Sequence, residues 1–206
     1  MSGQFFVVNL REYLDKNDPA LITINKLHKL ISSFSCSLNP DVENFIKHNA
    51  IEFTKKDQSV TYLVFRQNDQ DEADFVGYFS LTIKPISIHS SVTISKSMAR
   101  KLERISVLDE NTGTYTAATY LIAQLGKNFA ISEERSINGD ELLELALDII
   151  SQAKYLLGEV IEFLECEDND ALMKFYEHNG FRFFNSRITQ GENSHKLNQL
   201  VKFIKS

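Results

Sequence analysis

The segment from Asp168 to Phe181 constrains the fold more than any other part of this sequence. It reads DNDALMKFYEHNGF and follows the short apolar run VIEFLEC. Asp168 or Asn169 suits the N-cap of a helix, and Gly180 suits the position just past a helix end. The pattern predicts a buried strand, a short helix capped at both ends, and a new strand that starts at Phe181. Such a helix holds its one tyrosine, Tyr176, at a fixed place.

Several positions of this segment together resemble the C-terminal motif of the GNAT superfamily of acetyl-CoA-dependent N-acetyltransferases, in its bacterial branch. They are Asn169, Ala171, Phe175-Tyr176 and Gly180-Phe181. The resemblance extends over about residues 40 to 204. It implies an α/β (α+β) fold with a GNAT-like mixed central sheet of about six to seven strands, flanked by helices and containing a splayed pair of parallel strands.

The same resemblance implies transfer of an acetyl group from acetyl-CoA to a primary amine, by direct attack in a ternary complex and without a metal. Tyr176 would be the general acid. The attack expels a thiolate with a pKa of about 8.5, and a phenol with a pKa of about 10 can protonate it without being ionised at neutral pH. Two alternatives remain open: a catalytically inactive GNAT-like binding or regulatory module, and a toxin-type aminoacyl-tRNA acetyltransferase.

The family's pyrophosphate loop, Q/R-x-x-G-x-G/A, joins a central strand, expected here at 119 to 131, to the next helix. In this alignment Glu134 takes the Gln/Arg position, Ile137 the first glycine and Gly139 the second, so one glycine of the pair is present. The backbone of 128 to 131 would pair with the pantetheine amides, and free N–H groups at the helix start would bind the phosphates. The implied cofactor-binding residues are Asn128, Phe129, Ala130, Ile131, Arg135, Asn138, Gly139, Asp140, Asn169 and Phe175.

The helix after this loop is predicted to begin at Asn138 and to end at Gly158. Asn138 and Glu141 have the spacing of a capping box, and an apolar stripe continues to Leu156 and Leu157. Asp140 and Glu141 in the first turn would repel a pyrophosphate that they faced. Alternatively, they complement the positive end of the helix dipole.

The rest of the chain is expected to belong to one domain, 1 to 206, although a two-part layout is also open. Residues 1 to 40 are expected to form a helical N-terminal extension that opens with a short strand, and residues 42 to 53 a helix. Two strands, 60 to 66 and 75 to 83, are expected to form a hairpin around an acidic loop at 67 to 74. Residues 87 to 118 would be an insertion before the central strand. A last strand at 197 to 204 could pair within the chain or in a homodimer.

Charge and composition narrow the expected partners. The formal net charge of −6 makes nucleic acid an unlikely main partner, although basic residues recur on a predicted helix at 97 to 105. Neither a transmembrane run nor a signal peptide is recognisable, and Cys36 and Cys166 have neither disulfide-framework nor zinc-site spacing. We therefore expect a cytoplasmic protein without a membrane partner.

The general base is not identified by the sequence. Glu165 and Glu167 alternate with Cys166, so both glutamates should lie on the strand face opposite the cysteine. Either is a candidate base, as are His89 and His178, but no spacing selects one of them. Cys166 itself is more typical of packed core than of a nucleophile.

Overall fold

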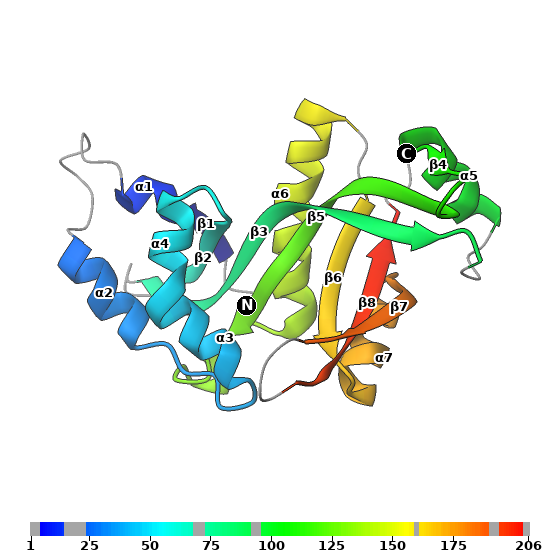
Figure 1. Ribbon diagram of the computed structural model, residues 1–206. Helices are drawn as coiled ribbons and strands as arrows, with labels where there is room; N and C mark the ends of the chain where they lie inside the picture. The colour runs from blue at the N-terminus through cyan, green and yellow to red at the C-terminus, as the bar shows by residue number, and fades with distance from the viewer. Residues whose placement is uncertain are drawn as a thin grey trace. The chain divides into compact units, whose positions relative to one another are not determined.

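The computed structural model in Figure 1 describes residues 5–14, 24–67, 73–91, 96–158, 161–189 and 194–203. The chain divides into two compact units. Unit 1 contains Met1–Thr82 and Ala123–Ile149, and unit 2 contains Ile83–Ile122 and Ile150–Ser206. Three long elements contribute residues to both units: strand β3 (Ala73–His89), strand β5 (Thr114–Lys127) and helix α6 (Gly139–Leu157).

Unit 1 begins with one strand, which is followed by several short helices and then by a second strand. Its further elements are β1 (Phe5–Asn9), α1 (Leu10–Leu14), α2 (Ile24–Ser32), α3 (Pro40–Asn44), a π-helical turn (Phe45–Asn49), α4 (Ala50–Lys55) and β2 (Val60–Gln67). The start of α3 is fixed by Asn39, whose side chain accepts hydrogen bonds from the N–H groups of Asp41 and Val42. The predicted helix over 42 to 53 and the predicted hairpin are both confirmed, since β2 and β3 pair antiparallel.

Two apolar clusters cover the strands of unit 1. Helices α1 to α4 pack on a cluster that contains Leu63, Phe75 and Tyr78, and α6 packs on a second cluster through Leu142 and Ala146 (Figure 1). Gly126 on β5 allows a close approach in the first cluster. A Cβ atom there would lie 2.5 Å from Val42 and 2.8 Å from Tyr78, so a larger residue would force the strand away from α3.

Unit 2 contains α5 (Lys96–Ile105), β4 (Leu108–Asp109), β6 (Ile161–Glu167), α7 (Asp170–His178), β7 (Arg182–Ile188) and β8 (Lys196–Lys202). Its core is built on Phe163 and Phe184, and α5 adds Leu102. The stretch 87 to 118, predicted as an insertion, holds the end of β3, then α5 and β4, and the start of β5. Strand β8 pairs with β6 on one edge and β7 on the other, so this last strand pairs within the chain.

The eight described strands pair in the order β1-β2-β3-β5-β6-β8-β7, with β4 beside β5. Strands β5 and β6 are parallel, whereas β1–β2, β2–β3, β6–β8 and β7–β8 are antiparallel. This arrangement confirms the predicted mixed sheet with flanking helices. No helix within the described ranges combines the length and the apolar character needed to cross a membrane.

Helix α6 differs from the prediction at its C-terminal end. Its buried side follows the predicted stripe through Leu142, Leu143, Ala146 and Ile150. The predicted continuation of that stripe is wrong, because Leu156 and Leu157 are 77% and 73% exposed. Periodicity alone cannot tell where the surface beneath a helix ends.

Candidate active site

Helix α7 carries Tyr176 and is capped at both ends. Of the two N-cap candidates, Asn169 serves, since its Oδ1 accepts hydrogen bonds from the N–H groups of Ala171 (2.8 Å) and Leu172 (3.3 Å). Gly180 ends the helix with φ at +86°, a conformation that glycine adopts without strain. The predicted strand, capped helix and following strand are therefore confirmed.

The phenol of Tyr176 lies among apolar groups of unit 2. Its ring contacts Phe175 with centroids 4.9 Å apart and Phe181 with centroids 5.9 Å apart. Its hydroxyl has no hydrogen bond to any residue in the described part of the chain. Burial, assisted by the nearby Cys166, raises the pKa of Tyr176 well above its ordinary value. The side chain is therefore a protonated phenol at neutral pH.

The parallel pairing of β5 with β6 is short. It joins Thr119–Ile122 to Ile161–Leu164 in four residue pairs, although β5 continues to Lys127 and β6 to Glu167. On its other edge, β6 pairs with β8 from Glu162 to Glu167. Among the described residues, β5 from 123 to 127 therefore has no pairing to β6.

The predicted limits of this central strand, 119 to 131, are wrong at both ends. The strand starts at Thr114 and stops at Lys127, because Asn128 is 1% exposed and locks the chain into a turn. Asn128 Oδ1 accepts hydrogen bonds from the N–H groups of Ser35 (3.0 Å) and Ala130 (3.1 Å). Its Nδ2 donates to the carbonyl of Phe75 at 2.8 Å.

The four residues from Asn128 to Ile131 were expected to pair with pantetheine, and most of their N–H groups are engaged within unit 1. Asn128 N–H donates to Val76 O (2.9 Å) and Phe129 N–H to Ser35 O (2.8 Å), while that of Ala130 is held by Asn128 itself. Sequence reasoning missed these hydrogen bonds of the turn because Ser35 lies 93 residues away from Asn128 along the chain. A buried asparagine gives no local pattern that identifies its partners.

The loop between β5 and α6 is held by side chains of unit 1. Arg135 Nη1 contacts both carboxylate oxygens of Asp74, at 3.2 and 3.1 Å, and Arg66 donates to the carbonyl of Glu134 at 2.6 Å. Asp74 ends the predicted acidic loop, of which 68 to 72 lie outside the described residues. Ile137, at the first-glycine position, is completely buried in the α6 cluster. An apolar anchor thus replaces the glycine.

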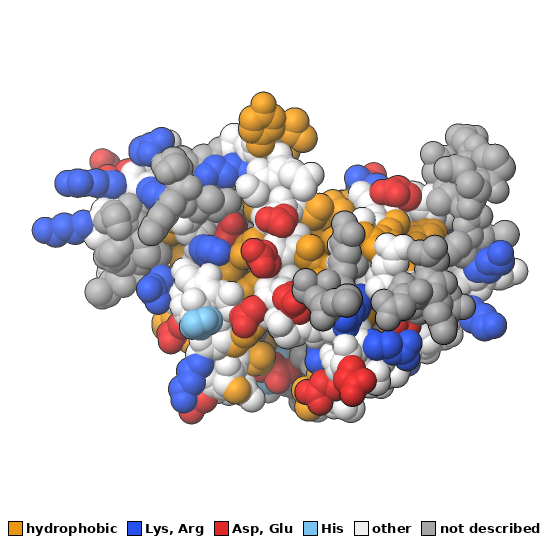
Figure 2. Space-filling model, turned by 180° about the vertical axis from the view of Figure 1, so that it is seen from behind, with side chains coloured by type: hydrophobic (Ala, Val, Ile, Leu, Met, Phe, Trp, Pro, Cys, Tyr) orange, Lys and Arg blue, Asp and Glu red, His pale blue; other side chains and the backbone are white. Residues whose placement is uncertain are grey.

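The predicted capping box at the start of α6 is confirmed. Asn138 N–H donates to Glu141 Oε2 (3.0 Å), and Glu141 N–H donates to Asn138 Oδ1 (2.8 Å). The N–H of Gly139 has no partner within the described ranges. The outer side of the helix is acidic, with the side chains of Asp140, Glu141, Glu144 and Asp148, and Figure 2 shows acidic side chains gathered in this region.

The candidate bases differ in their surroundings. Glu165 accepts hydrogen bonds from Arg187 and Gln199; burial acts to raise its pKa, but these bonds outweigh burial and lower it. Glu167 is exposed. His89 contacts Ser91 through Nδ1 at 2.7 Å, and His178 is exposed on α7. None of these side chains combines burial with an available lone pair.

Cys166 lies on the other face of β6 from Glu165, as the strand alternation predicts, and its sulfur is 3.9 Å from that of Met173 on α7. Burial raises the pKa of this thiol to about 11, so it is no nucleophile at neutral pH. Across the described ranges, no group of three His, Cys, Asp or Glu side chains could hold a metal ion.

Comparison with protein-family models gives no match, and no curated protein matches the chain. Solved structures do match. One is AtaT complexed with acetyl-methionyl-tRNAfMet, at 16% identity over 95% of this chain and 94% of that chain, with a TM-score of 0.59. A tyrosine-to-phenylalanine mutant of KacT gives the same four values. AtaTR bound with AcCoA is 18% identical over 96% of this chain and 94% of that chain, with a TM-score of 0.56.

At these identities the likeness shows a common fold, and it agrees with the GNAT-like architecture expected from the sequence. The expectation that nucleic acid is an unlikely partner finds no support in these comparisons, because one of the similar proteins was solved with a tRNA.

Proposed function

We propose that this protein is an N-acetyltransferase that moves an acetyl group from acetyl-CoA to a primary amine. The observation that carries the proposal is the four-pair parallel register of β5 and β6, followed directly by the capped helix that presents Tyr176. A parallel pair that ends while both strands continue leaves backbone donors and acceptors on a strand edge for a ligand. The similarity of the fold to AtaTR bound with AcCoA supports the same ligand here.

Tyr176 is the proposed general acid. The amine nitrogen attacks the thioester carbonyl carbon, the carbon–sulfur bond breaks, and the departing sulfur takes the phenolic proton. The raised pKa of Tyr176 keeps the phenol protonated at neutral pH. It also makes the phenol a weaker acid than the CoA thiol, so the proton transfer to sulfur is uphill and the tyrosinate is reprotonated before the next turnover. The base that removes the amine proton remains unassigned.

Residues proposed to contact acetyl-CoA occur in unit 1 and in unit 2. In unit 1, we propose that the unpaired edge of β5 from 123 to 127 pairs with the pantetheine amides, in place of the turn at 128 to 131. The phosphates would lie at the start of α6, near Asn138, Gly139 and Asp140, where the Gly139 N–H points along the helix dipole. Arg135 would contribute charge while still held by Asp74. In unit 2, Asn169 caps α7 and Phe175 supports the tyrosine ring.

The first experiment is a thermal-shift titration of the purified protein with acetyl-CoA. A ligand at a hundred times its Kd adds about 2.7 kcal/mol of stability. Tyr176→Phe should retain that shift but lose the release of free CoA thiol in the presence of an amine acceptor. Tyr155→Phe is the matched control, since Tyr155 is 90% exposed. No shift with acetyl-CoA would reject the proposal, and a shift without turnover on any acceptor would favour the binding module.

A second candidate specifies the acceptor as the amino group of an aminoacyl-tRNA. Two observations favour it: the similar fold of AtaT complexed with acetyl-methionyl-tRNAfMet, and the basic residues along α5 in unit 2, which are Lys96, Arg100, Lys101 and Arg104. The test compares an aminoacyl-tRNA with the corresponding amino acid amide as acceptor. Arg100→Ala should weaken transfer to the tRNA and reduce its salt dependence without affecting the amide. Equal rates for both acceptors would argue against tRNA.

A further inference from the structure

Glu162 is a buried carboxyl group in unit 2 that the proposed reaction does not use. Its side chain is 3% exposed, and its Oε2 has no hydrogen-bond partner among the described residues. An ionised carboxylate in such a place is costly unless it is paired, so a small change of environment decides whether it carries a proton. Burial raises the pKa of Glu162 to about 7, and the lysines Lys202 and Lys154 oppose that rise.

The elements packed against β6 bring a defined set of groups to this carboxyl. Lys202, its register partner on β8, has Nζ 3.8 Å from Oε2, within reach of charge attraction but too far for a hydrogen bond. Helix α6 contributes Lys154. Tyr120, the register partner on β5, has a buried hydroxyl that also lacks a partner in the described part of the chain. The charged side chains and the histidine of α7 are all exposed.

Lys202 connects this carboxyl to the end of the tyrosine helix. Its Nζ lies 5.5 Å from the centre of the Phe181 ring, and its alkyl chain passes 3.6 Å from the place a Cβ atom on Gly180 would occupy. The Phe181 ring in turn packs edge-on against Tyr176. Lys202 therefore runs beside the residue that ends α7 and places its ammonium group over the aromatic ring that supports the phenol.

We propose that Glu162 is a protonation switch that acts through Lys202 and Phe181 on the position of Tyr176, an inference that rests on the proposed role of that tyrosine. When ionised, Glu162 holds the ammonium group of Lys202 over β6. When it takes a proton from solvent, that attraction is lost, Lys202 is held by the Phe181 ring alone, and the new O–H becomes a donor beside the unpartnered Tyr120 hydroxyl. Glu162 is a positioning residue in this scheme and does not touch the reacting atoms.

The switch is tested in the full chain without acetyl-CoA. Carboxyl-labelled glutamate and ring-labelled tyrosine, followed by carbon-13 NMR from acid to alkaline pH, should show Glu162 titrating with a midpoint near pH 7 and the Tyr176 signal moving with the same midpoint. Tyr176→Phe assigns the tyrosine signal. A Glu162 midpoint below pH 5, or a Tyr176 signal that is constant while Glu162 titrates, would overturn the proposal.

Substitutions test each step of the proposed path from Glu162 through Lys202 to Tyr176. Glu162→Gln should abolish the movement of the Tyr176 signal, whereas Glu167→Gln, at an exposed site on the same strand, should leave it unchanged. Lys202→Met removes an opposing cation, so it should raise the Glu162 midpoint and uncouple Tyr176 from it. A Tyr176 signal that still follows the Glu162 midpoint in Lys202→Met would rule out the path through Lys202.

Thermal stability and catalysis provide separate readouts. Because the pKa of Glu162 is raised in the folded state, the contribution of this group to stability is fully present below its pKa in the unfolded chain and is lost as the pH rises through the folded value of about 7. The Glu162→Gln protein should lack that fall in melting temperature. If the protein transfers acetyl groups, kcat should change near pH 7 in the unmodified protein and not in Glu162→Gln. Coupled NMR titration without any acetyl transfer would support the switch while rejecting the proposed function.

Discussion

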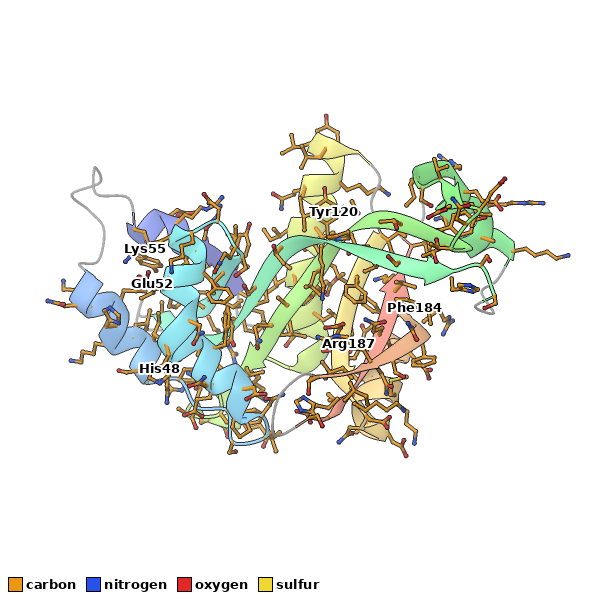
Figure 3. The ribbon with its side chains drawn as sticks, viewed as in Figure 1. His48, Glu52, Lys55, Tyr120, Phe184 and Arg187 are labelled. Atoms are coloured by element: carbon orange, nitrogen blue, oxygen red, sulfur yellow. The ribbon has the colours of Figure 1, made fainter. Side chains whose placement is uncertain are left out.

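Arg187 on β7 donates two hydrogen bonds to Glu165 on β6, from Nε to Oε1 and from Nη2 to Oε2, each 2.7 Å long. Gln199 donates a third, to Oε1 at 2.8 Å, and Lys84 lies 3.9 Å from Oε2. Figure 3 labels Arg187, whose side chain reaches Glu165 although β8 lies between β7 and β6. A carboxylate with this many donors is stabilised in its ionised form and accepts a further proton poorly. Glu165 therefore organises the surface of unit 2 and is a poor candidate for the general base.

The first prediction is that Glu165→Gln destabilises the protein by about 1–2 kcal/mol at neutral pH, because the charge-assisted bonds to Arg187 become neutral ones. The pKa of Glu165 is lowered in the folded state, so this stabilisation is present above the pKa of the unfolded chain and is lost as the pH falls through the folded value. Urea unfolding at several pH values measures the difference. It should shrink in acid, and Glu167→Gln should show no comparable loss.

The same variant tests the catalytic assignment. If Glu165 only stabilises the fold, Glu165→Gln retains the pH profile of acetyl transfer, even where the rate changes slightly. Loss of the acidic limb of that profile in this variant would instead make Glu165 the base.

The second prediction concerns the ionisation of Tyr176. Its pKa is raised by burial, so the phenol stays protonated beyond the ordinary value of about 10. Between about pH 8 and pH 10, the rate of acetyl transfer should therefore show no fall caused by this group. Tyr176→Phe should lower the rate by about 10²- to 10⁴-fold across that range. A descending limb below pH 10 that disappears in Tyr176→Phe would show that the tyrosine ionises earlier than its surroundings suggest.

Local sequence signals predicted several ends of helices α6 and α7. The capping box of Asn138 and Glu141, the N-cap at Asn169 and the helix stop at Gly180 all depend on residues within a few positions of one another, and all three are present. The β2–β3 hairpin was equally readable, since β-branched and aromatic residues mark both strands.

Features that depend on distant residues were not predicted. The end of β5 is set by Asn128, whose partner Ser35 comes from the connection between α2 and α3. Arg135 was expected to be available for phosphate, but Asp74, 61 residues away, holds it. The raised pKa of Glu162 likewise depends on burial in the folded sheet and not on its neighbours in the sequence. The tertiary partners of a polar side chain produce no periodic pattern in the sequence.

The third prediction concerns the acidic start of α6. Glu141→Gln keeps an acceptor for the Asn138 N–H but removes one negative charge beside the proposed phosphate site. Acetyl-CoA should bind more tightly by about 0.3–1 kcal/mol, which is a two- to fivefold lower Kd. Calorimetric titration measures the change, and high salt should reduce it.

The control for this experiment is Glu144→Gln, one turn further along the exposed side of α6. Its effect on Kd should be smaller, because the field of a helix end falls off beyond the first turn. Equal effects of the two substitutions would indicate that only net charge matters, and no effect of either would place the phosphates elsewhere.

The fourth prediction is that Asn128→Asp destabilises unit 1 more than any surface asparagine does. The substitution keeps an oxygen for the N–H groups of Ser35 and Ala130 but removes the donor to the Phe75 carbonyl, and it places a charge at a site that is 1% exposed. An unsatisfied buried group costs about 1–3 kcal/mol, and more when it is charged. Because burial raises the pKa of a carboxyl, the loss of stability should be smaller in acid than at pH 7.

Denaturant unfolding of Asn128→Asp, compared with Asn185→Asp at an exposed position of β7, measures the loss of stability and its pH dependence. A loss of stability in Asn128→Asp no greater than that in Asn185→Asp would mean that the hydrogen bonds of the Asn128 side chain do not hold the end of β5.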